Sequence, residues 1–132
     1  MDKNQTKLVY PDLSYKVSGI LFAVHNELGR YCNEKQYSDC IEKHFKKFNI
    51  PYEREKFLPA SFEGELKGRN KVDFLADNKI IVEVKAKRVL GREEYYQTRR
   101  YLEAEKKKLG IIANFREKYL RPRRILNSSV SY

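Results

Sequence analysis

The segment from Lys79 to Lys87, KIIVEVKAK, limits the possible folds of this chain more than any other. Alternate residues of an extended strand face opposite sides, which predicts an apolar face and a mixed face: Ile80, Val82, Val84 and Ala86 against Ile81, Glu83, Lys85 and Lys87. A strand this apolar belongs in a core, where burying a charge costs several kcal/mol unless the charge is paired or binds a metal. The fold must therefore pack this strand in a sheet and provide partners for its charges.

The rest of the chain predicts helices around this sheet. Apolar residues at helical spacing indicate helices over 14–28 and from the N-cap Asn33 to just before Pro51. Strands are expected at 52–59, 67–76 and 79–87, then a helix over 92–109 and strands at 111–115 and 119–126. Pro122 cannot donate to a ladder, so the last strand should lie at an edge or begin after it. This order predicts an α/β or α+β sandwich with a mixed sheet and a helical layer on each face.

Composition bounds the class of protein. The chain has 132 residues, 41% hydrophobic and 35% charged, which fits one domain and excludes a disordered chain or a membrane protein. We expect a domain over 14–126 with tails at 1–13 and 127–132. The first residues lack a secretory apolar stretch, and Cys32 and Cys40 form no disulfide framework, so we expect a cytoplasmic protein with reduced thiols. The net charge of +10 favours a nucleic-acid partner; the alternative is a solvated basic surface.

A second acid, Asp73, lies in the apolar segment KVDFLA before the strand Lys79 to Lys87, which we call the signature strand. In an antiparallel hairpin, a two-residue turn would pair Asp73 with Val82 and leave the two acids on opposite faces. A three-residue turn at 77–79 pairs Asp73 with Glu83. We predict the odd-length turn, or a bulge of equal effect, because only this register brings the carboxylates together with Lys85.

Such a cluster suits a hard cation. Mg²⁺ or Mn²⁺ takes oxygen ligands, often carboxylates with waters and substrate phosphate. Asp73 and Glu83 are the candidate ligands, with the backbone carbonyl of Val84 as a third oxygen, and Lys85 is placed to orient the attacking water or offset charge. The alternative is a structural salt bridge between Lys85 and the two acids.

Glu34 is a further candidate acid, at the predicted start of the second helix. It lies on the same side of the helix as Tyr37 and Ile41, so it could point inward. The alternative is an exposed first-turn acid that interacts favourably with the helix dipole.

Basic and aromatic residues follow the proposed site and form a candidate nucleic-acid surface. Arginine and lysine hold phosphates, and tyrosines stack on unpaired bases. The candidates are Lys87, Arg88, Arg92, Arg99, Arg100, Tyr95 and Tyr96. Core packing is favoured for Tyr101 and stays an alternative for Tyr95 and Tyr96.

The remaining residues argue against a zinc site, an iron–sulfur cluster, a Ser/His/Asp hydrolase and a nucleotide-binding loop. His25 and His44 have no cysteine or histidine at ligand spacing, so no zinc site is predicted. Two cysteines are too few for an iron–sulfur cluster. The sequence contains no Ser/His/Asp arrangement and no glycine-rich phosphate loop.

Together these residues resemble the GxxExxY protein family, a branch of the PD-(D/E)XK nuclease-like superfamily, over Ser14 to Leu126. The matching elements are Glu34-Lys35-Gln36-Tyr37, Val72-Asp73-Phe74, IIVEVKA from Ile80, Gln97 with Tyr101-Leu102, and LGIIANF from Leu109. The chain departs from the family in having Tyr31 at the position of the motif glycine. The resemblance implies a nuclease-like α/β core with a central mixed sheet flanked by helices. It also implies a metal-dependent site of Asp73, Glu83 and Lys85, with Glu34 and Gln97 as additional active-site residues.

Three functions follow. The first is a nuclease that hydrolyses phosphodiester bonds of DNA or RNA with a metal-activated water. For this function we expect DNA as the nucleic-acid partner and a homodimer as the oligomeric state. The second is a nucleic-acid-binding or protein-interaction module that does not cleave, and the third is a basic structural protein whose acids are merely paired. The intact Asp73, Glu83 and Lys85 favour the first, because a non-catalytic module has no need for a costly acid cluster.

Overall fold

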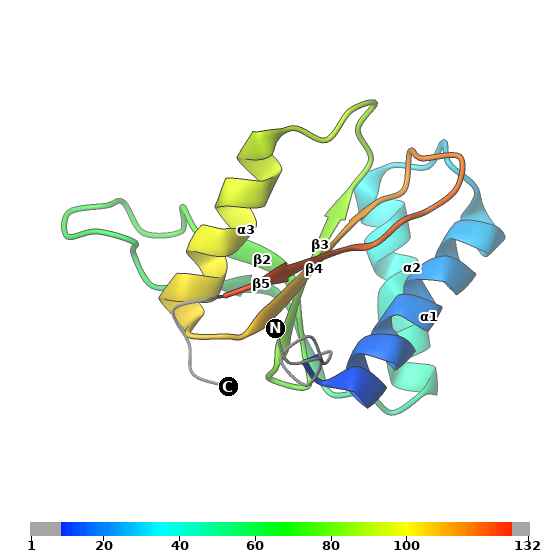
Figure 1. Ribbon diagram of the computed structural model, residues 1–132, viewed down its shortest axis with the longest axis horizontal. Coiled ribbons are helices and arrows are strands. Elements are labelled where there is room, and N and C mark those ends of the chain that lie inside the picture. The colour runs from blue at the N-terminus through cyan, green and yellow to red at the C-terminus, as the bar shows by residue number, and fades with distance from the viewer. Residues whose placement is uncertain (1–8, 128–132) are drawn as a thin grey trace, which may run out of the picture.

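A five-stranded sheet lies between two layers of helix in the computed structural model, which describes residues 9–127 (Figure 1). Most of the two predicted tails, residues 1–8 and 128–132, lies outside the described part. The elements in chain order are α1 (Pro11–Leu28), α2 (Glu34–Lys47), β1 (Tyr52–Phe57), β2 (Lys71–Ala76), β3 (Ile80–Lys85), α3 (Arg92–Glu105), β4 (Leu109–Asn114) and β5 (Arg123–Leu126).

The sheet is mixed, as the sequence predicts. Its strand order is β1-β2-β3-β4-β5, so the signature strand β3 is central. β3 is antiparallel to β2 and parallel to β4, while β1–β2 and β4–β5 are antiparallel pairs. The parallel pair requires a crossover, which α3 provides. The fold is therefore α/β with β3 paired on both sides.

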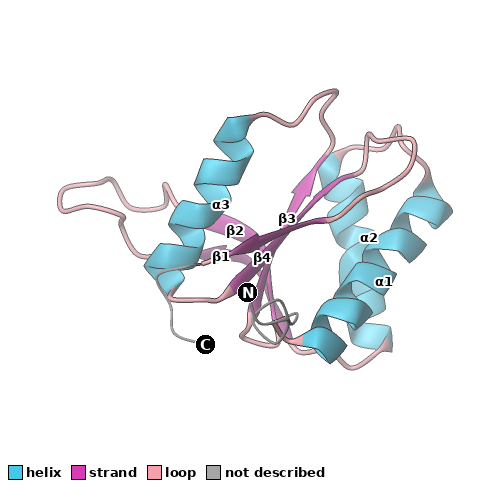
Figure 2. Ribbon diagram, viewed as in Figure 1, coloured by secondary structure: helices cyan, strands magenta, loops and turns pink. Residues whose placement is uncertain are grey.

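The two faces of the sheet are covered by different helices. α1 and α2 lie against one face and α3 against the other (Figures 1 and 2). The alternation of β3 follows this division: Ile80, Val82 and Val84 pack in the core beneath α1 and α2, and Ile81 packs in the core beneath α3. No helix among residues 9–127 is long and apolar enough to cross a bilayer.

Several boundaries differ from the sequence predictions. α1 begins at Pro11, three residues earlier, because proline is readily accommodated in the first turn of a helix. α3 ends at Glu105 instead of 109: Lys106 adopts a left-handed φ of 55°, and Leu109 already pairs with Ile80 of β3. β5 begins after Pro122 and lies at the sheet edge, which confirms the constraint that proline places on this strand.

Candidate active site

The β2–β3 hairpin has the odd-length turn that the acids require. Ala76 pairs with Ile80 and Phe74 with Val82, which leaves three residues, 77–79, in the turn. The same register carried one residue further sets Asp73 against Glu83. The predicted parity is therefore confirmed.

Asp73 lies at a break in the sheet. The ladder to β3 ends at Phe74, and the ladder to β1 skips Glu55, whose φ is 52°. Val72 packs with Leu75 in the core beneath α3, although strict alternation would place these two residues on opposite faces. The backbone around Asp73 therefore departs from the regular pleat where the acids meet.

At this break, side chains take the place of ladder bonds. The Val84 N–H donates to Oδ2 of Asp73 at 2.7 Å, and the Asp73 N–H donates to Oε2 of Glu83 at 3.1 Å. Each carboxylate is thus bonded to the backbone of the opposite strand. This reciprocal arrangement fixes both acids on rigid elements of the sheet.

Glu83 is 2% exposed, and this burial raises its pKa well above the usual range. The negative charge of Asp73 raises the pKa further, and the more distant cation of Lys85 partly opposes it. A buried carboxylate beside a second, half-buried carboxylate calls for a compensating positive charge. The donor set is hard oxygen, so it fits a divalent cation such as Mg²⁺, with Asp73 and Glu83 as the groups that would hold it.

Lys85 ends β3, two residues beyond Glu83, and is half-buried. Among residues 9–127, no ion pair within 4.0 Å joins Lys85 to Asp73 or Glu83. The two acids therefore approach each other without a salt bridge to Lys85, which disfavours the purely structural interpretation of the cluster.

Glu34 is the first residue of α2, and its side chain is exposed. The Ala86 N–H, just past the end of β3, donates to Oε2 of Glu34 at 3.3 Å. Glu34 and Asp73 also line one hollow of about 260 Å³ between α2 and β1. Of the two positions that the sequence left open, Glu34 thus takes the exposed one, yet its carboxylate lies toward the site.

The start of α2 is fixed by the predicted cap. The Asn33 side chain accepts from the Gln36 N–H, and the Gln36 side chain accepts from the Asn33 N–H, both at 2.8 Å. The Tyr37 hydroxyl donates to the Gly29 carbonyl at 2.6 Å, and Gly29 has a φ of 76°. Tyr31, at the position of the motif glycine, is 78% exposed, so the turn accommodates its side chain in solvent.

α3 supplies the next candidates. Gln97 is half-buried on this helix, and no contact of its side chain tests its predicted role. Tyr101 is 4% exposed and packs in the core beneath α3, as predicted. Burial raises its pKa, and the charges of Glu83 and Asp73 act in the same direction.

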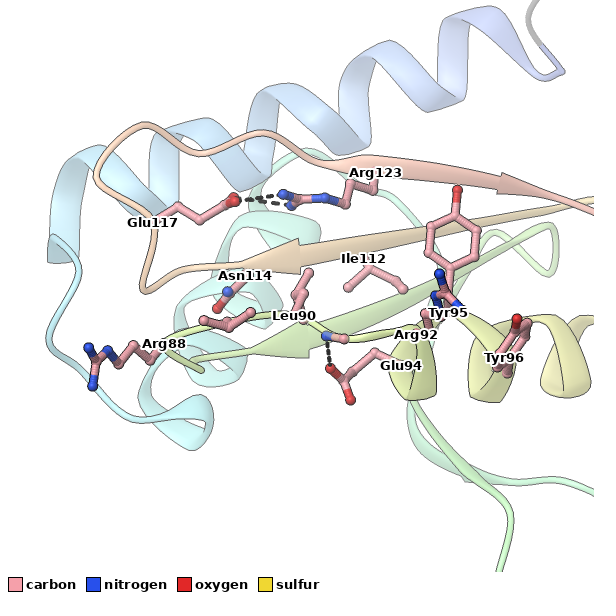
Figure 3. Close-up of a pocket in the computed structure, with 12 residues that line it drawn as sticks. Arg88, Leu90, Arg92, Glu94, Tyr95, Tyr96, Ile112, Asn114, Glu117 and Arg123 are labelled. Atoms are coloured by element: carbon pink, nitrogen blue, oxygen red, sulfur yellow. Dashed lines mark hydrogen bonds and ion pairs between the residues drawn. The ribbon is translucent and has the colours of Figure 1, made fainter.

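The predicted basic and aromatic residues are all exposed, and four of the seven line one pocket of about 560 Å³ (Figure 3). These four are Arg88, Arg92, Tyr95 and Tyr96. Lys87 instead pairs with Glu94 at 3.2 Å, and Arg99 and Arg100 lie further along α3.

Two residues that hold the backbone of this region, Asn114 and Glu94, were not predicted from the sequence. Asn114 exchanges two hydrogen bonds with the backbone of Lys87, accepting from its N–H at 2.9 Å and donating to its carbonyl at 2.8 Å. Glu94 accepts from the Gly91 N–H at 2.7 Å, and this bond lowers its pKa. A polar residue ending the apolar strand LGIIAN was the available signal for Asn114, and the spacing Gly91 to Glu94 was that for Glu94.

One of the two histidines, His44, lies beside other potential metal ligands, which the sequence did not predict. His25 donates from Nε2 to the Glu117 carbonyl at 2.7 Å, a structural contact. Cys40, however, lies one helical turn before His44, and Glu27 of α1 brings its carboxylate to both. The ligand atoms of these three residues lie within 4.8 Å of one another, so the statement that His44 has no cysteine at ligand spacing is wrong. The sequence argument against a zinc site therefore does not hold for His44.

Comparison with known proteins identifies the class. The family model described as the PD-(D/E)XK nuclease superfamily matches residues 11–125. The chain therefore belongs to the PD-(D/E)XK nuclease superfamily, whose nucleases generally use divalent metal ions. No curated protein matches the chain, and no solved structure does. Membership of the narrower GxxExxY family stays a prediction.

Proposed function

We propose that this protein is a metal-dependent nuclease that hydrolyses phosphodiester bonds of nucleic acid, with DNA as the expected substrate. One observation carries the proposal: Asp73 and Glu83 converge at the sheet break, and Glu83 is desolvated beside a second carboxylate. The proximity of these two carboxylates is unfavourable without a cation, and a bound divalent cation would both stabilise the pair and support hydrolysis.

Asp73, Glu83 and the carbonyl of Val84 would hold Mg²⁺ or Mn²⁺. When bound, the ion polarises the phosphodiester and lowers the pKa of a water. Lys85, which forms no ion pair with either acid, would orient the water or stabilise negative charge on the phosphate oxygens. Glu34 faces the same hollow as Asp73 and would accept a proton or a hydrogen bond from the water, and Gln97 would act as an accessory residue.

Hydrolysis follows from these roles. The water oxygen forms a bond to phosphorus as the bond to the leaving oxygen breaks. The water gives up its proton, and the leaving oxygen becomes a hydroxyl. The basic surface beside the site supplies affinity for phosphate.

The test is cleavage of single-stranded, duplex and branched DNA and of RNA, with Mg²⁺, Mn²⁺ or EDTA. We expect cleavage with metal and its loss in Asp73→Asn, with affinity for nucleic acid retained. The matched control is Asp77→Asn in the turn of the same hairpin, because its carboxylate pairs with Lys79 outside the site. If the folded wild type binds nucleic acid but cleaves no substrate with either metal, the protein is a binding module.

A further inference from the structure

The pocket introduced above lies at the carboxyl end of β4, between the loop 86–91 and the start of α3 (Figure 3). We call it the Tyr95 pocket, and the residues that line it include Arg88, Leu90, Arg92, Tyr95, Tyr96 and Ile112. Tyr95 is 43% exposed and Tyr96 is 61% exposed, so both rings have free surface. Apolar walls, aromatic rings and arginines thus share one concave site.

The pocket lies directly beside β3, the strand that carries Glu83 and Lys85. Ile112 of β4 pairs with Glu83 of β3, and Asn114 pairs with Lys85. Neighbouring strands are roughly 4.8 Å apart. Ile112 also packs with Tyr101 in the core beneath α3. The floor of the pocket is therefore one strand away from the candidate metal ligands.

The pocket is held in shape by bonds that do not need a ligand. Asn114 fixes the backbone of Lys87 with two hydrogen bonds of 2.9 and 2.8 Å. Glu94 fixes the Gly91 N–H at 2.7 Å, a contact drawn in Figure 3. The loop 86–91 is thus tied to β4 at one end and to α3 at the other, so the cavity is preformed.

The charge inside the pocket is positive after its ion pairs are taken into account. Glu94 pairs with Lys87 at 3.2 Å, and Glu117 pairs with Arg123 at 2.8 Å. Within the part of the chain that the structure describes, no ion pair engages Arg88 or Arg92. Both acids that line the pocket are neutralised, and two arginines remain for an anionic ligand.

We propose that the Tyr95 pocket receives one unpaired nucleotide of the substrate, with the base against Tyr95 and the phosphates at Arg88 and Arg92. This inference rests on the proposed function in taking nucleic acid as the ligand. A base inside a duplex is stacked on both faces and paired at its edge, so it reaches such a pocket only when it leaves the helix. Single strands and frayed or branched ends are therefore the preferred substrates.

Binding is tested in EDTA, so that no cleavage intervenes. The probes are a fluorescein-labelled single-stranded DNA that carries one 2-aminopurine, and a blunt DNA hairpin of the same total length whose loop is a hexaethylene glycol linker, so that the hairpin has no unpaired base. The variants are Tyr95→Leu, which removes the ring and keeps an apolar side chain, and the pair Arg88→Gln with Arg92→Gln. The matched control is Tyr15→Leu, because Tyr15 is 82% exposed on α1, on the other side of the sheet. Thermal unfolding checks that each variant is folded.

We expect tighter binding of the single strand than of the hairpin by the wild type, with 2-aminopurine quenched by stacking. Tyr95→Leu should weaken single-strand binding by about 5- to 100-fold and relieve the quenching, because a base stacked on an aromatic ring contributes on this scale. The double arginine variant should weaken binding and flatten its dependence on salt. Tyr15→Leu should match the wild type in every assay.

The outcomes separate this inference from the proposed function. Equal affinity for single strand and hairpin, or the same loss for both in Tyr95→Leu, overturns the inference even where metal-dependent cleavage is intact. Selective, Tyr95-dependent single-strand binding in a protein that never cleaves supports the pocket and overturns the nuclease proposal.

Discussion

Replacing Glu83 by glutamine should make the metal-free protein more stable while removing its activity. Glu83 is 2% exposed beside Asp73, and both burial and that charge raise its pKa. Each pKa unit by which the folded value exceeds the unfolded one removes about 1.4 kcal/mol of stability once the group is ionised. An amide of the same shape keeps the oxygen that accepts from the Asp73 N–H and carries no charge. We expect Glu83→Gln to raise the free energy of unfolding by about 1–3 kcal/mol at pH 8 in EDTA.

The sign of the pH dependence is fixed by the raised pKa. Below the unfolded pKa, roughly 4.3 for a glutamate, the carboxyl is protonated in both states and has no ionisation penalty. As pH rises from there to the folded pKa, the wild type loses stability that the variant keeps. The gap between the two proteins should therefore open across this interval and stay constant above it.

Urea unfolding in EDTA, followed by far-ultraviolet circular dichroism between pH 4 and pH 8, measures this gap. The matched control is Glu94→Gln, a second buried glutamate whose pKa is lowered by the Gly91 N–H and by Lys87. Its charged form is favoured by folding, so this substitution should lower stability at pH 8, and the loss should fade as pH falls. Added Mg²⁺ should stabilise the wild type, by about 1.4 kcal/mol at ten times its Kd, and have a smaller effect on Glu83→Gln.

Two results would refute this reasoning. The first is a Glu83→Gln protein less stable than the wild type at pH 8 in EDTA, which would mean that the carboxylate is satisfied without a cation. The second is a gain of equal size at pH 4 and pH 8, which would mean that the substitution acts through packing and not through charge.

Further predictions concern the packing of α3 and the thiol of α2. Gly110→Ala should destabilise the fold by about 1–3 kcal/mol, because the new Cβ would lie 2.8 Å from Cγ2 of Thr98, and Thr98→Ser should recover part of that loss in urea unfolding. Burial and the hydrogen bond to Glu27 raise the pKa of Cys40 to about 11, so its alkylation by iodoacetamide at pH 8 should be slow. Glu27→Gln should lower that pKa and speed the reaction at Cys40 while leaving Cys32 unchanged, as peptide mass spectrometry would show; an unchanged rate at Cys40 would contradict the stated role of Glu27.

The hairpin that carries the acids was predicted from its local pattern together with the requirement that the two acids meet. The alternation of KIIVEVKAK determined which residues face each core, and the structure distributes Ile80, Ile81 and Val82 accordingly. The turn length did not follow from alternation, since both turns suit the apolar residues. The need to bring Asp73 and Glu83 together selected the three-residue turn, and the register confirms it.

The ends of elements were harder to predict because distant residues decide them. The residues after Glu105 are compatible with a longer helix, yet Leu109 pairs with Ile80 and extends β4 backward. The break at Asp73 has the same origin, since it depends on a left-handed Glu55 in the neighbouring strand. Neither partner is near in sequence to the residue that it affects.

The Tyr95 pocket could not be predicted from the sequence, although several of its residues could. Sequence alone placed Arg88, Arg92 and two tyrosines near the signature strand, but as a charged surface and not as a cavity. The cavity exists because Asn114, 27 residues from Lys87 along the chain, locks the loop 86–91 against β4. Two neutralising ion pairs then leave the pocket its positive charge. The proposed metal site is thus encoded in a short hairpin, whereas the proposed nucleotide pocket depends on contacts between β4, the loop and α3.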